Sequence, residues 1–521
     1  MNNKIVIIQV IALYASLFSY ITFDGKEVPP FAPPPANAVN VSTLSQFSAA
    51  LNTQTAGQTI VLADGVYSVA NIEPLSIRVN NLTIRGASGD PSKVIISGKG
   101  FENCAYPDEE MFMFNNHASN VTFADFTISE SRCHGIKLQS NANNNCLIHN
   151  MRFINIGERM IKSPGIAIGN VNVSLSWEIR YSHFENTKVP LNDSCRNDHD
   201  GGNYIAGMDL MSCEDWNIHD NVFMNIKGAS GMARGAVFPW AGTQTGGGTW
   251  VGCKNMTTQR NTFVGCDQSI CYWGTVTGGL IKNNIILPGN IGIKINNSVN
   301  IKVYNNTSFS ANSASSGAFS FSQSTGCELK NNIIYGGMTA VGTSLDTAKN
   351  MMIGRSLRLI AAQWFGDEAS ADLHLKSDTC GPVDAGVSLP EVTDDWDGLS
   401  RDAMPDIGAD ELSNNTNITM LECSQSNTLY LSNAGPNPCN PVTAFRYGIP
   451  ARYAGLPFSI VVLSPKGDAV KTIKSGVAFP GNYMVRWDGK DDSGRPASSG
   501  IYVIHLATGT ASRTVKVALM K

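Results

Sequence analysis

Apolar and polar positions recur with a short period through the middle of the chain. One column of positions carries mostly large apolar side chains, at Phe126, Phe153, Phe184, Phe223, Phe263, Ile286, Ser308 and Ile334. Asparagine stands two residues before the later members, at Asn221, Asn261, Asn284, Asn306 and Asn332. A second column lies five residues before the first, at Val121, Ile148, Ile179, Ile218, Thr258, Ile281, Val303 and Leu329. Such columns indicate that equivalent positions of successive repeats stack on one another.

The spacing of the repeat predicts an all-β solenoid. Successive members of the first column are 22 to 40 residues apart, and the leucine spacing of leucine-rich repeats is absent. A right-handed parallel β-helix fits this pattern, because its coils of short strands stack with a rung spacing of about 4.8 Å. The asparagines are expected to form a ladder at one turn, where their amides bond to the rungs above and below.

The segment before the repeat predicts a cap. In "VSTLSQFSAALN", Ser42 or Thr43 can N-cap a short helix. Leu44, Phe47 and Leu51 would share one face of that helix. The helix would cover the open end of the first rung, as a solenoid requires.

Six stretches of the repeat region carry a family resemblance. "TIVLADGVYSV" and "NLTIRGASGDPSKVII" resemble the N-terminal rungs of the pectate-lyase-like β-helix superfamily, which includes chondroitinase-B-like and alginate-lyase-like proteins. "HGIKLQS", "NIGERMIK" and "YIAGMDLMSCEDWNIHDNVFMNI" resemble secreted bacterial β-helix proteins described as probable pectate lyases. "PDIGADEL" is similar to the segment that closes many such domains. The resemblance implies the fold of residues 40–412 well and the reaction poorly.

The pattern changes after residue 412. "FSIVVLSPKGDAVKTIKSG" and "GNYMVRWDGKDDSGRPASSGIYVIHLATG" alternate apolar and polar residues between Gly/Asp turns, which predicts a small antiparallel β-sandwich. The stretch resembles the FlgD-like immunoglobulin-fold module that ends many exported bacterial proteins. That resemblance implies contact with secretion machinery or the cell surface rather than chemistry.

The N-terminus predicts export. A lysine precedes an apolar run in "MNNKIVIIQVIALYASLFSYITF", and a Pro-rich stretch follows; this order is typical of a signal peptide or an N-terminal anchor. The expected organisation is therefore a signal or anchor (1–23), a Pro-rich linker (24–39), the β-helix (40–412), a linker (413–427) and the sandwich (428–521). We expect a secreted or cell-surface monomer.

Composition narrows the function. A net charge of −4 gives no electrostatic footprint for nucleic acid. The 12 cysteines suit an oxidising compartment, but no pair has the spacing and histidine partners of a zinc site. Buried, core-filling thiols are the simplest interpretation of those inside the repeat.

The longest repeat intervals are consecutive, between Phe153 and Phe263. Their insertions are expected to build the walls of a groove in the middle of the β-helix. Trp240 and Trp250 lie within them and can either stack on sugar rings or pack the loops.

Lys162 stands out in the pattern. An inward phase is shared by Met160, Ile270, Ile293 and Val341. Lys162 lies two residues after Met160, where later rungs carry Tyr272 and Ile295, so it is predicted at a core-facing position. A buried, unpaired ammonium is too costly, so Lys162 must bulge outward or be paired.

Neighbouring rungs carry charged groups at similar places. These are His134 and Lys137 on the rung before, Asp209 on the rung after and Arg234 on the next. Because rungs are about 5 Å apart, His134, Lys162, Asp209 and Arg234 are expected to line one face over about 15 Å as a functional cluster. Solvated charges and structural ion pairs are the alternative interpretation.

The chemistry that fits is β-elimination of an acidic polysaccharide, which needs a base and a cation that neutralises the uronate carboxylate. Lys162 could be the base, Arg159 or Arg234 could bind the carboxylate, and Asp209 could orient Lys162 or hold a metal. Calcium held by carboxylates is another way to neutralise the uronate. Further candidates are Lys137, Glu158, Trp240 and Trp250 for substrate binding, and Asp198, His199 and Asp200 in "NDHDGG" as weak metal ligands.

Two other classes stay open. A glycoside hydrolase needs two opposed carboxylates, and Glu158 is the only acid near enough to Asp209 in the repeat to be the second. A non-catalytic glycan-binding or adhesin solenoid is compatible with the terminal sandwich.

Overall fold

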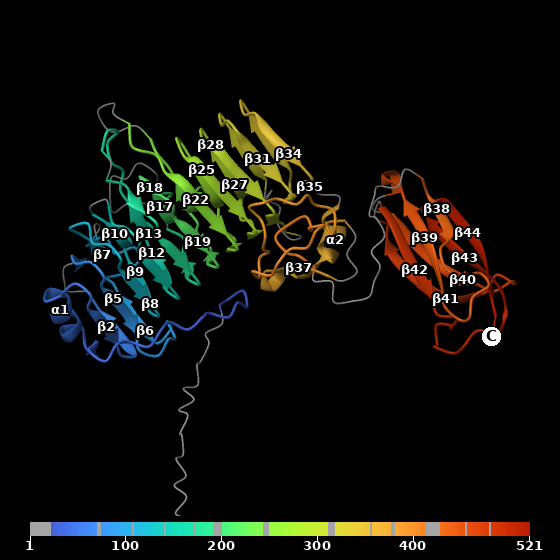
Figure 1. Ribbon diagram of the computed structural model, residues 1–521, viewed down its shortest axis with the longest axis horizontal. Coiled ribbons are helices and arrows are strands. Elements are labelled where there is room, and N and C mark those ends of the chain that lie inside the picture. Colours follow the sequence, from blue (N-terminus) through green and yellow to red (C-terminus); the bar gives the residue numbers. More distant parts are fainter. Residues whose placement is uncertain are drawn as a thin grey trace, which may run out of the picture.

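The repeat region folds into a parallel β-helix with three sheets (Figure 1). The computed structural model describes residues 22–520 except 70–73, 107–108, 140–141, 171, 191–200, 243–248, 311–317, 355–356, 377–380, 413–427, 454–455 and 479–480. Each rung contributes one strand to each sheet, and every strand pairs in parallel with the strand of the next rung. The predicted parallel β-helix is thus confirmed.

The first sheet has 14 strands in the described chain. In spatial order they are β1 (Val39–Val41), β2 (Thr59–Leu62), β5 (Thr83–Gly86), β8 (Thr122–Ala124), β11 (Leu147–His149), β15 (Glu178–Arg180), β19 (Asn217–His219), β22 (Lys254–Gln259), β25 (Thr277–Lys282), β28 (Val299–Tyr304), β31 (Cys327–Lys330) and β34 (Leu345–Ala348), with β14 (Ser174–Leu175) and β18 (Cys213–Glu214) beside them.

The second sheet has 11 described strands. They are β3 (Gly65–Ser68), β6 (Val94–Ser97), β9 (Thr127–Ser131), β12 (Arg152–Ile156), β16 (His183–Glu185), β20 (Val222–Met224), β23 (Thr262–Val264), β26 (Ile285–Leu287), β29 (Thr307–Ser308), β32 (Ile333–Tyr335) and β35 (Met351–Ile353).

The third sheet, called here the ten-stranded sheet, carries most of the predicted site. Its described strands are β4 (Leu75–Ile77), β7 (Glu110–Phe114), β10 (His134–Leu138), β13 (Arg159–Ser163), β17 (Ala206–Leu210), β21 (Gly235–Pro239), β24 (Gln268–Trp273), β27 (Ile291–Asn296), β30 (Phe319–Ser322) and β33 (Met338–Val341).

The apolar columns stack as the periodicity predicts over most of their length. Phe153, Phe184, Phe223 and Phe263 are register partners, and their rings stack with centroids 4.7–4.9 Å apart. The first member of each column is wrong by two residues. Ile128 rather than Phe126 pairs with Phe153, and Phe123 rather than Val121 pairs with Ile148. All of these side chains are buried, so apolar character alone does not tell the two positions apart.

The asparagine ladder forms where it is expected. Each side-chain amide nitrogen donates to the side-chain oxygen of the next asparagine at 2.8–3.1 Å, through Asn221, Asn261, Asn284, Asn306, Asn332 and Asn350. The same amide donates to a main-chain carbonyl of the preceding rung, as Asn284 does to Thr258 at 2.9 Å. The ladder therefore satisfies buried polar groups at every turn that it crosses.

The predicted helix caps the first rung. Helix α1 (Leu44–Asn52) is N-capped by Thr43, whose hydroxyl oxygen accepts from the Gln46 backbone N–H at 3.2 Å. Phe47, Ala50 and Leu51 are its buried residues. The cap residue is thus Thr43, the second of the two candidates.

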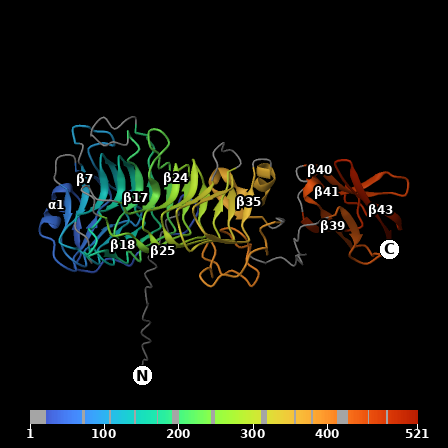
Figure 2. The ribbon, with the colours of Figure 1, turned by 90° about the horizontal axis from the view of Figure 1, so that it is seen from above.

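A segment after the last rungs packs on the outer face of the second sheet, beside β35 (Figure 2). It contains α2 (Arg358–Ala361), η2 (Ala362–Trp364), β36 (Phe365–Asp367), η3 (Glu368–Ser370) and β37 (Asp372–Leu375). Trp364, Phe365, Trp396 and Ile407 form a second apolar cluster with Ile333 and Tyr335 of β32. The side chain of Arg401 pairs with Glu411 at 2.9 Å and donates to the carbonyls of Gly408 and Ala409.

The N-terminal Pro-rich segment lies along the β-helix from residue 22 onward. Lys26 pairs with Asp220 at 2.9 Å, donates to the Arg260 carbonyl at 2.7 Å and lies 3.9 Å from the Trp396 ring centroid. Further along the segment, the Pro29 carbonyl lies 3.1 Å from Nε2 of His149. This segment therefore ties several rungs together.

The C-terminal region forms a separate antiparallel sandwich. One sheet contains β38 (Tyr430–Asn433), β39 (Thr443–Ile449) and β42 (Gly481–Trp487); the other contains β41 (Ala469–Val477), β40 (Pro457–Leu463), β43 (Gly500–Thr508) and β44 (Ala511–Leu519). A short helix, η4 (Ala451–Tyr453), joins β39 to the strands that follow. Trp487, Phe445 and Ile504 lie at the centre of its own core. Among the described elements, no helix has the length and apolarity needed to cross a bilayer.

Removing one amide from the ladder should destabilise the β-helix. Asn284→Ala removes two donated bonds and leaves the backbone and side-chain N–H groups of Asn261 without their acceptor. Because buried polar groups left unpaired cost about 1–3 kcal/mol each, we expect a loss of about 2–4 kcal/mol in the free energy of unfolding. Chemical denaturation measures this loss, with Asn40→Ala at an exposed position as the control. Equal stability of the two variants would contradict a stabilising role of the ladder.

The sandwich should fold without the β-helix. Residues 428–521 have a core of their own, so the isolated segment should unfold cooperatively when it is heated. Circular dichroism and calorimetry of the excised segment test this. A non-cooperative transition would mean that the sandwich depends on the β-helix.

Candidate functional site

The outer face of the ten-stranded sheet brings several predicted residues together. Lys137, Lys162 and Asp209 are successive register partners on β10, β13 and β17. His134 and Arg159 are partners in a neighbouring row of the same strands. Long connections flank both edges of the sheet at these rungs: residues 98–109, 186–205 and 225–234 lead into it, and residues 164–173 and 240–253 leave it.

Lys162 points away from the core and is paired with Asp209 at 2.8 Å, so the core phase given by the repeat count is wrong, whereas a lysine that is turned outward or paired was expected. Met160 and Ile161 are both fully buried in the core, which interrupts the alternation of the strand. Ile161, not Met160, is in register with Met208 and through it with the inward column of Val237 and Ile270. The same register places Met338 rather than Val341 in this column.

Asp209 is the centre of the charged cluster. Its Oδ2 atom accepts from Arg159 Nε at 2.6 Å and lies 2.8 Å from Lys162 Nζ. Its Oδ1 atom accepts from the indole N–H of Trp240 at 2.6 Å. The Asp209 side chain is fully buried, that of Arg159 is 1% exposed and that of Lys162 is 13% exposed. One buried carboxylate is therefore shared by two cations.

This arrangement has opposite effects on the two titrating partners. Burial alone would raise the pKa of Asp209, but the charges of Lys162 and Arg159 hold it well below its usual range. Burial lowers the pKa of Lys162, and the charge of Arg159 lowers it further against the pull of Asp209. Asp209 is thus an anion at neutral pH, while Lys162 is an ammonium that loses its proton more easily than a free lysine.

Arg159 is committed inside the cluster. Its guanidinium lies 3.0 Å from the Tyr204 ring centroid and donates to the Tyr204 carbonyl. With 1% of its side chain exposed, Arg159 holds Asp209 and does not face a substrate. Lys137, in the row of Lys162 and Asp209, is more accessible: its side chain is 29% exposed and its Nζ lies 2.6 Å from Glu110 Oε1.

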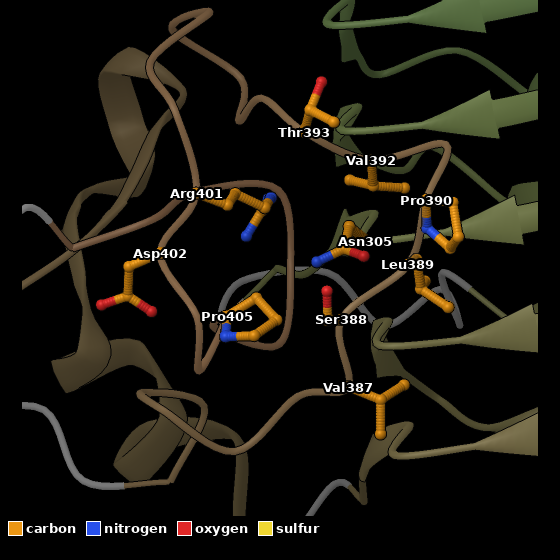
Figure 3. A pocket seen from close by; sticks show the side chains of 10 residues that line it. All are labelled: Asn305, Val387, Ser388, Leu389, Pro390, Val392, Thr393, Arg401, Asp402 and Pro405. Carbon is orange, nitrogen blue, oxygen red and sulfur yellow. The ribbon is translucent and has the colours of Figure 1, made fainter.

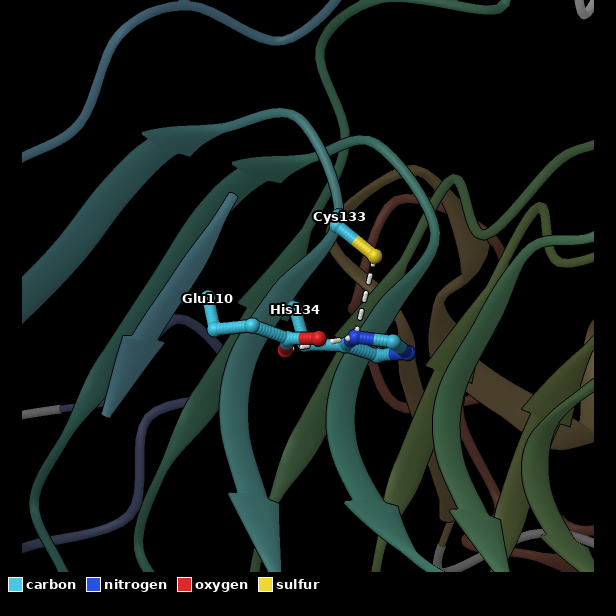
Figure 4. A group of neighbouring side chains, drawn as sticks. All are labelled: Glu110, Cys133 and His134. Carbon is cyan, nitrogen blue, oxygen red and sulfur yellow. Dashed lines mark hydrogen bonds and ion pairs between the residues drawn. The ribbon is translucent and has the colours of Figure 1, made fainter. Parts of the chain in front are cut away.

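A second cluster lies one rung earlier (Figure 4). The Nδ1 atom of His134 lies 2.8 Å from Glu110 Oε2 and 3.0 Å from Cys133 Sγ. Cys133 Sγ in turn lies 3.1 Å from Glu158 Oε2. Burial would raise the pKa of Glu110, but the hydrogen bonds from His134 and Lys137 hold it below its usual range. Burial raises the pKa of the Cys133 thiol, and Glu158 raises it further.

Aromatic side chains continue the outer face beyond Asp209. The Trp240 ring stacks on that of Phe238 with centroids 5.7 Å apart. The backbone of Trp240 pairs in parallel with that of Trp273 on the next rung. Trp273 is 40% exposed, and Lys294 Nζ lies 4.6 Å from its ring centroid. Trp250 is placed differently. Its backbone pairs with that of Ala167, and its ring covers Gly165, where an added Cβ would lie 2.7 Å from the ring. Trp250 therefore packs a loop.

The remaining predicted residues are placed as follows. Arg234 is exposed and immediately precedes β21, two rungs from Lys162. Asp198, His199 and Asp200 lie outside the described residues. Glu110, Cys133, Tyr204, Trp273 and Lys294 were not among the sequence candidates. The repeat register could have found the last two, but the partners of Glu110 follow only from the fold.

Neither Asp209 nor the group at His374 fits calcium, which takes six to eight oxygen ligands. Asp209 lies between two cations, which would repel a third. In the group His374, Asp397 and Asp410, both histidine ring nitrogens already bond carboxylates, and the hydrogen bond to Asp397 raises the pKa of His374 to about 9. The protonated imidazole would also repel a metal ion.

A cavity of about 200 Å³ lies elsewhere, against the segment that packs on the second sheet (Figure 3). Its lining includes Asn305, Leu389, Arg401 and Pro405. The Arg401 guanidinium and the Asn305 amide are both occupied by main-chain carbonyls. Ser388, Thr393 and Asp402 add further polar groups to the lining, which includes no residue of the charged clusters on the ten-stranded sheet.

Comparison with known proteins found one family model and several solved structures. The FlgD Ig-like domain family model matches residues 457–512, within the sandwich. No curated protein matches the chain. The alginate lyase from Paenibacillus sp. str. FPU-7 is similar in structure at 12% identity, with a TM-score of 0.36 over 59% of this chain and 99% of that one.

Two other solved structures are similar at the same low level. The PL6 family polysaccharide lyase Pedsa3628 from Pseudopedobacter saltans has 11% identity and a TM-score of 0.32 over 61% of this chain and 93% of that one. The PL6 family alginate lyase AlyGC has 11% identity and a TM-score of 0.24, over 63% of this chain and 41% of that one.

Removing the shared carboxylate should cost more stability than removing the lysine. Asp209→Asn leaves Lys162 and Arg159 in buried contact without a counter-charge, so we expect a loss of about 3–5 kcal/mol. Lys162→Met leaves Asp209 paired with Arg159 and Trp240 and should cost clearly less. Denaturation of both variants, with the exposed Asp64→Asn as control, tests this order.

The effect of Asp209 should also depend on pH. Its native pKa is depressed, so its contribution is fully present above the unfolded pKa of about 3.9 and is lost as the pH falls towards the native pKa. The stability gap between the wild type and Asp209→Asn should narrow below about pH 4. A constant gap would contradict a charged Asp209.

Proposed function

We propose that the β-helix is an extracellular polysaccharide lyase that cleaves uronate-containing polymers by β-elimination, with Lys162 as the base. The observation that supports this most is the Asp209 carboxylate shared between Lys162 and Arg159 on the outer face of the ten-stranded sheet.

The outer face suits an anionic chain of sugar rings. Lys137, Lys162, Trp240, Trp273 and Lys294 lie on successive or nearby rungs of one sheet. Rungs are about 4.8 Å apart, so an extended polymer lying along the face would meet a cation or an indole at most rungs. Indole faces stack on sugar rings, while ammonium groups attract uronate carboxylates.

Lys162 is suited to take the proton α to the carboxylate. An arginine stays protonated in proteins, so when Lys162 gives up its proton the remaining Arg159–Asp209 pair is neutral. Losing the Lys162 proton therefore removes the excess positive charge of the buried cluster. Burial lowers the pKa of Lys162, and the charge of Arg159 lowers it further. Both effects move this pKa towards the range where a general base works best.

The elimination balances with this assignment. Neutral Lys162 takes the C5 proton, the C5 electrons form the C4–C5 double bond, and the bond from C4 to the glycosidic oxygen breaks. The leaving oxygen takes up a proton, which the Lys162 ammonium can return. Lys137, and Arg234 from two rungs away, are the exposed cations that would neutralise the carboxylate.

Other features support an extracellular setting. The N-terminal apolar run is typical of export. Cys104 is disulfide-bonded, and disulfides persist in oxidising compartments. The sandwich matches a FlgD Ig-like model, and we assign it to sorting or surface attachment.

Hydrolysis is supported less well by the described carboxylates. A glycosidase needs two carboxyl groups facing one bond. Asp209 accepts from three donors, and Glu158 is 1% exposed beside Arg132 and Cys133. Neither carboxylate faces the space that a sugar would occupy.

Lys162→Met should abolish turnover while the protein stays folded. The full chain is incubated with pectate, alginate and glycosaminoglycans, and unsaturated uronate ends are followed by their ultraviolet absorbance. Removal of a general base commonly costs about 10²–10⁴-fold in rate. Lys254→Met, at an exposed lysine of β22 in the first sheet, is the matched control and should keep full activity.

Three outcomes distinguish the alternatives. New reducing ends without ultraviolet absorbance would identify a hydrolase, and binding without products would identify a glycan-binding solenoid. Activity retained in Lys162→Met, together with a large stability loss, would make the Lys162–Asp209 pair purely structural. In the wild type, kcat/KM should rise with pH up to an apparent pKa below about 10.4, because only neutral Lys162 is a base; Lys162→Met should lose that limb.

A further inference from the structure

Two tight turns bring ligand-type atoms together next to the ten-stranded sheet. The turn before β13 stacks on the turn before β10, with the backbone N–H groups of Glu158 and Arg159 both donating to the Cys133 carbonyl at 3.1 Å. Gly157 makes this approach possible, because an added Cβ would lie 2.2 Å from the Arg132 carbonyl oxygen and 2.5 Å from that of Phe101. The stacking places the Glu158 carboxylate against the Cys133 thiol.

His134 completes the group and leaves one nitrogen without a partner. Its side chain is 7% exposed, and Nδ1 is held by Glu110, which Lys137 holds in turn. Nε2 is buried and has no hydrogen-bond partner among the described atoms. It lies 3.8 Å from Glu158 Oε2, which is too long for a hydrogen bond.

We propose that Cys133 Sγ, His134 Nε2 and Glu158 Oε2 bind a divalent transition-metal ion such as Zn²⁺, with Glu110 orienting the imidazole through Nδ1. Ligand atoms of a tetrahedral zinc ion are about 3.5 Å apart, given bonds of roughly 2.0–2.3 Å. The separations of 3.1 Å from Glu158 Oε2 to the thiol and 3.8 Å to Nε2 lie on either side of that value. The atoms of Glu110, Cys133 and His134 also lie within 4.8 Å of one another.

The surroundings have the features of a built metal site. A carboxylate that receives the second N–H of a metal-bound histidine fixes its tautomer and orientation, and Glu110 is positioned to do this. Arg132 lies 3.4 Å from the other oxygen of Glu158 and would fix that ligand in the same way. Both supports are in place before the ion enters, whereas the Cys133 thiol must leave its contacts with His134 Nδ1 and Glu158 Oε2 to become a ligand.

The donor set selects the kind of ion. A thiolate and an imidazole favour zinc, copper or cobalt, whereas calcium and magnesium prefer oxygen ligands. Binding must release the thiol proton to solvent, forming the S–metal bond as the S–H bond breaks. The ion would join β10 to the turns on both sides of it, and the proposal does not depend on lyase activity.

Cobalt and zinc titrations of the full-length protein test the site. After the metal has been removed with a chelator, Co²⁺ should produce a thiolate-to-cobalt charge-transfer band that saturates at a single ion per chain, and Zn²⁺ should displace it. Calorimetry in buffers of different ionisation enthalpy should detect a released proton. Zn²⁺ should also raise the midpoint of thermal unfolding.

Variants locate the ion. Cys133→Ser should remove the band, whereas Cys271→Ser, a buried cysteine on β24 of the same sheet, should leave it unchanged. His134→Asn should weaken Zn²⁺ binding at least about tenfold, and Glu110→Gln should weaken it about 10–100-fold while the band remains. Circular dichroism is used to check that each variant is folded. If Cys133→Ser does not fold, His134→Asn is used in its place to locate the ion.

Two results would overturn the proposal. One is the absence of saturable Co²⁺ binding by the folded full-length protein. The other is a charge-transfer band in Cys133→Ser equal to that of the wild type, which would place the ion on other cysteines.

Discussion

Parallel backbone pairing between rungs is the constraint on which this molecule depends. Each strand bonds to the equivalent strand of the next rung, so a residue type at one position is repeated at about 4.8 Å. Like therefore lies on like: phenylalanine rings stack at 4.7–4.9 Å, and asparagine amides bond in a continuous row. In both arrangements, the side chains that backbone pairing brings close together make favourable contacts.

Charged residues meet the same constraint with more difficulty. Lys137 and Lys162 are register partners, and two stacked ammonium groups repel. The chain relieves this repulsion by giving each lysine its own carboxylate, Glu110 for Lys137 and Asp209 for Lys162. Because Asp209 also serves Arg159, the second pair retains an excess positive charge, and a lysine with a lowered pKa follows from that imbalance.

The two clusters on this face differ in what they can bind. The Asp209 cluster would repel cations and holds an ammonium 5.9 Å from the Trp240 ring centroid. The cluster at His134 combines a thiol, an imidazole and carboxylates that are held by their own partners. They adjoin each other, because Glu158 of the second cluster directly precedes Arg159 of the first, and Lys137, which bonds Glu110, is the register partner of Lys162. The side chains that would carry the two proposed functions are nevertheless different, so single substitutions can test them separately.

Much of the fold could be predicted from the sequence, because it depends on a period. The columns at Phe153 and Asn221 and the helix that ends the solenoid follow from spacing and residue type, which backbone pairing translates directly into stacking. The change of pattern after residue 412 marked the sandwich for the same reason, since alternation and turns are local properties of a chain. Lys162 and Asp209 were also placed on neighbouring rungs by counting.

Tertiary structure decided the contacts that give those residues their chemistry. Met160 and Ile161 both turn inward, and only packing against neighbouring rungs shows that Lys162 therefore points outward. Arg159 and Asp209 are 50 residues apart, and their contact depends on a connection whose length does not fix its path. Cys133 and Glu158 meet because Gly157 allows two turns to touch. The sequence determines which residues share a rung, whereas side-chain direction and partner depend on how the rungs pack, because those are decided by volume and charge across the whole stack.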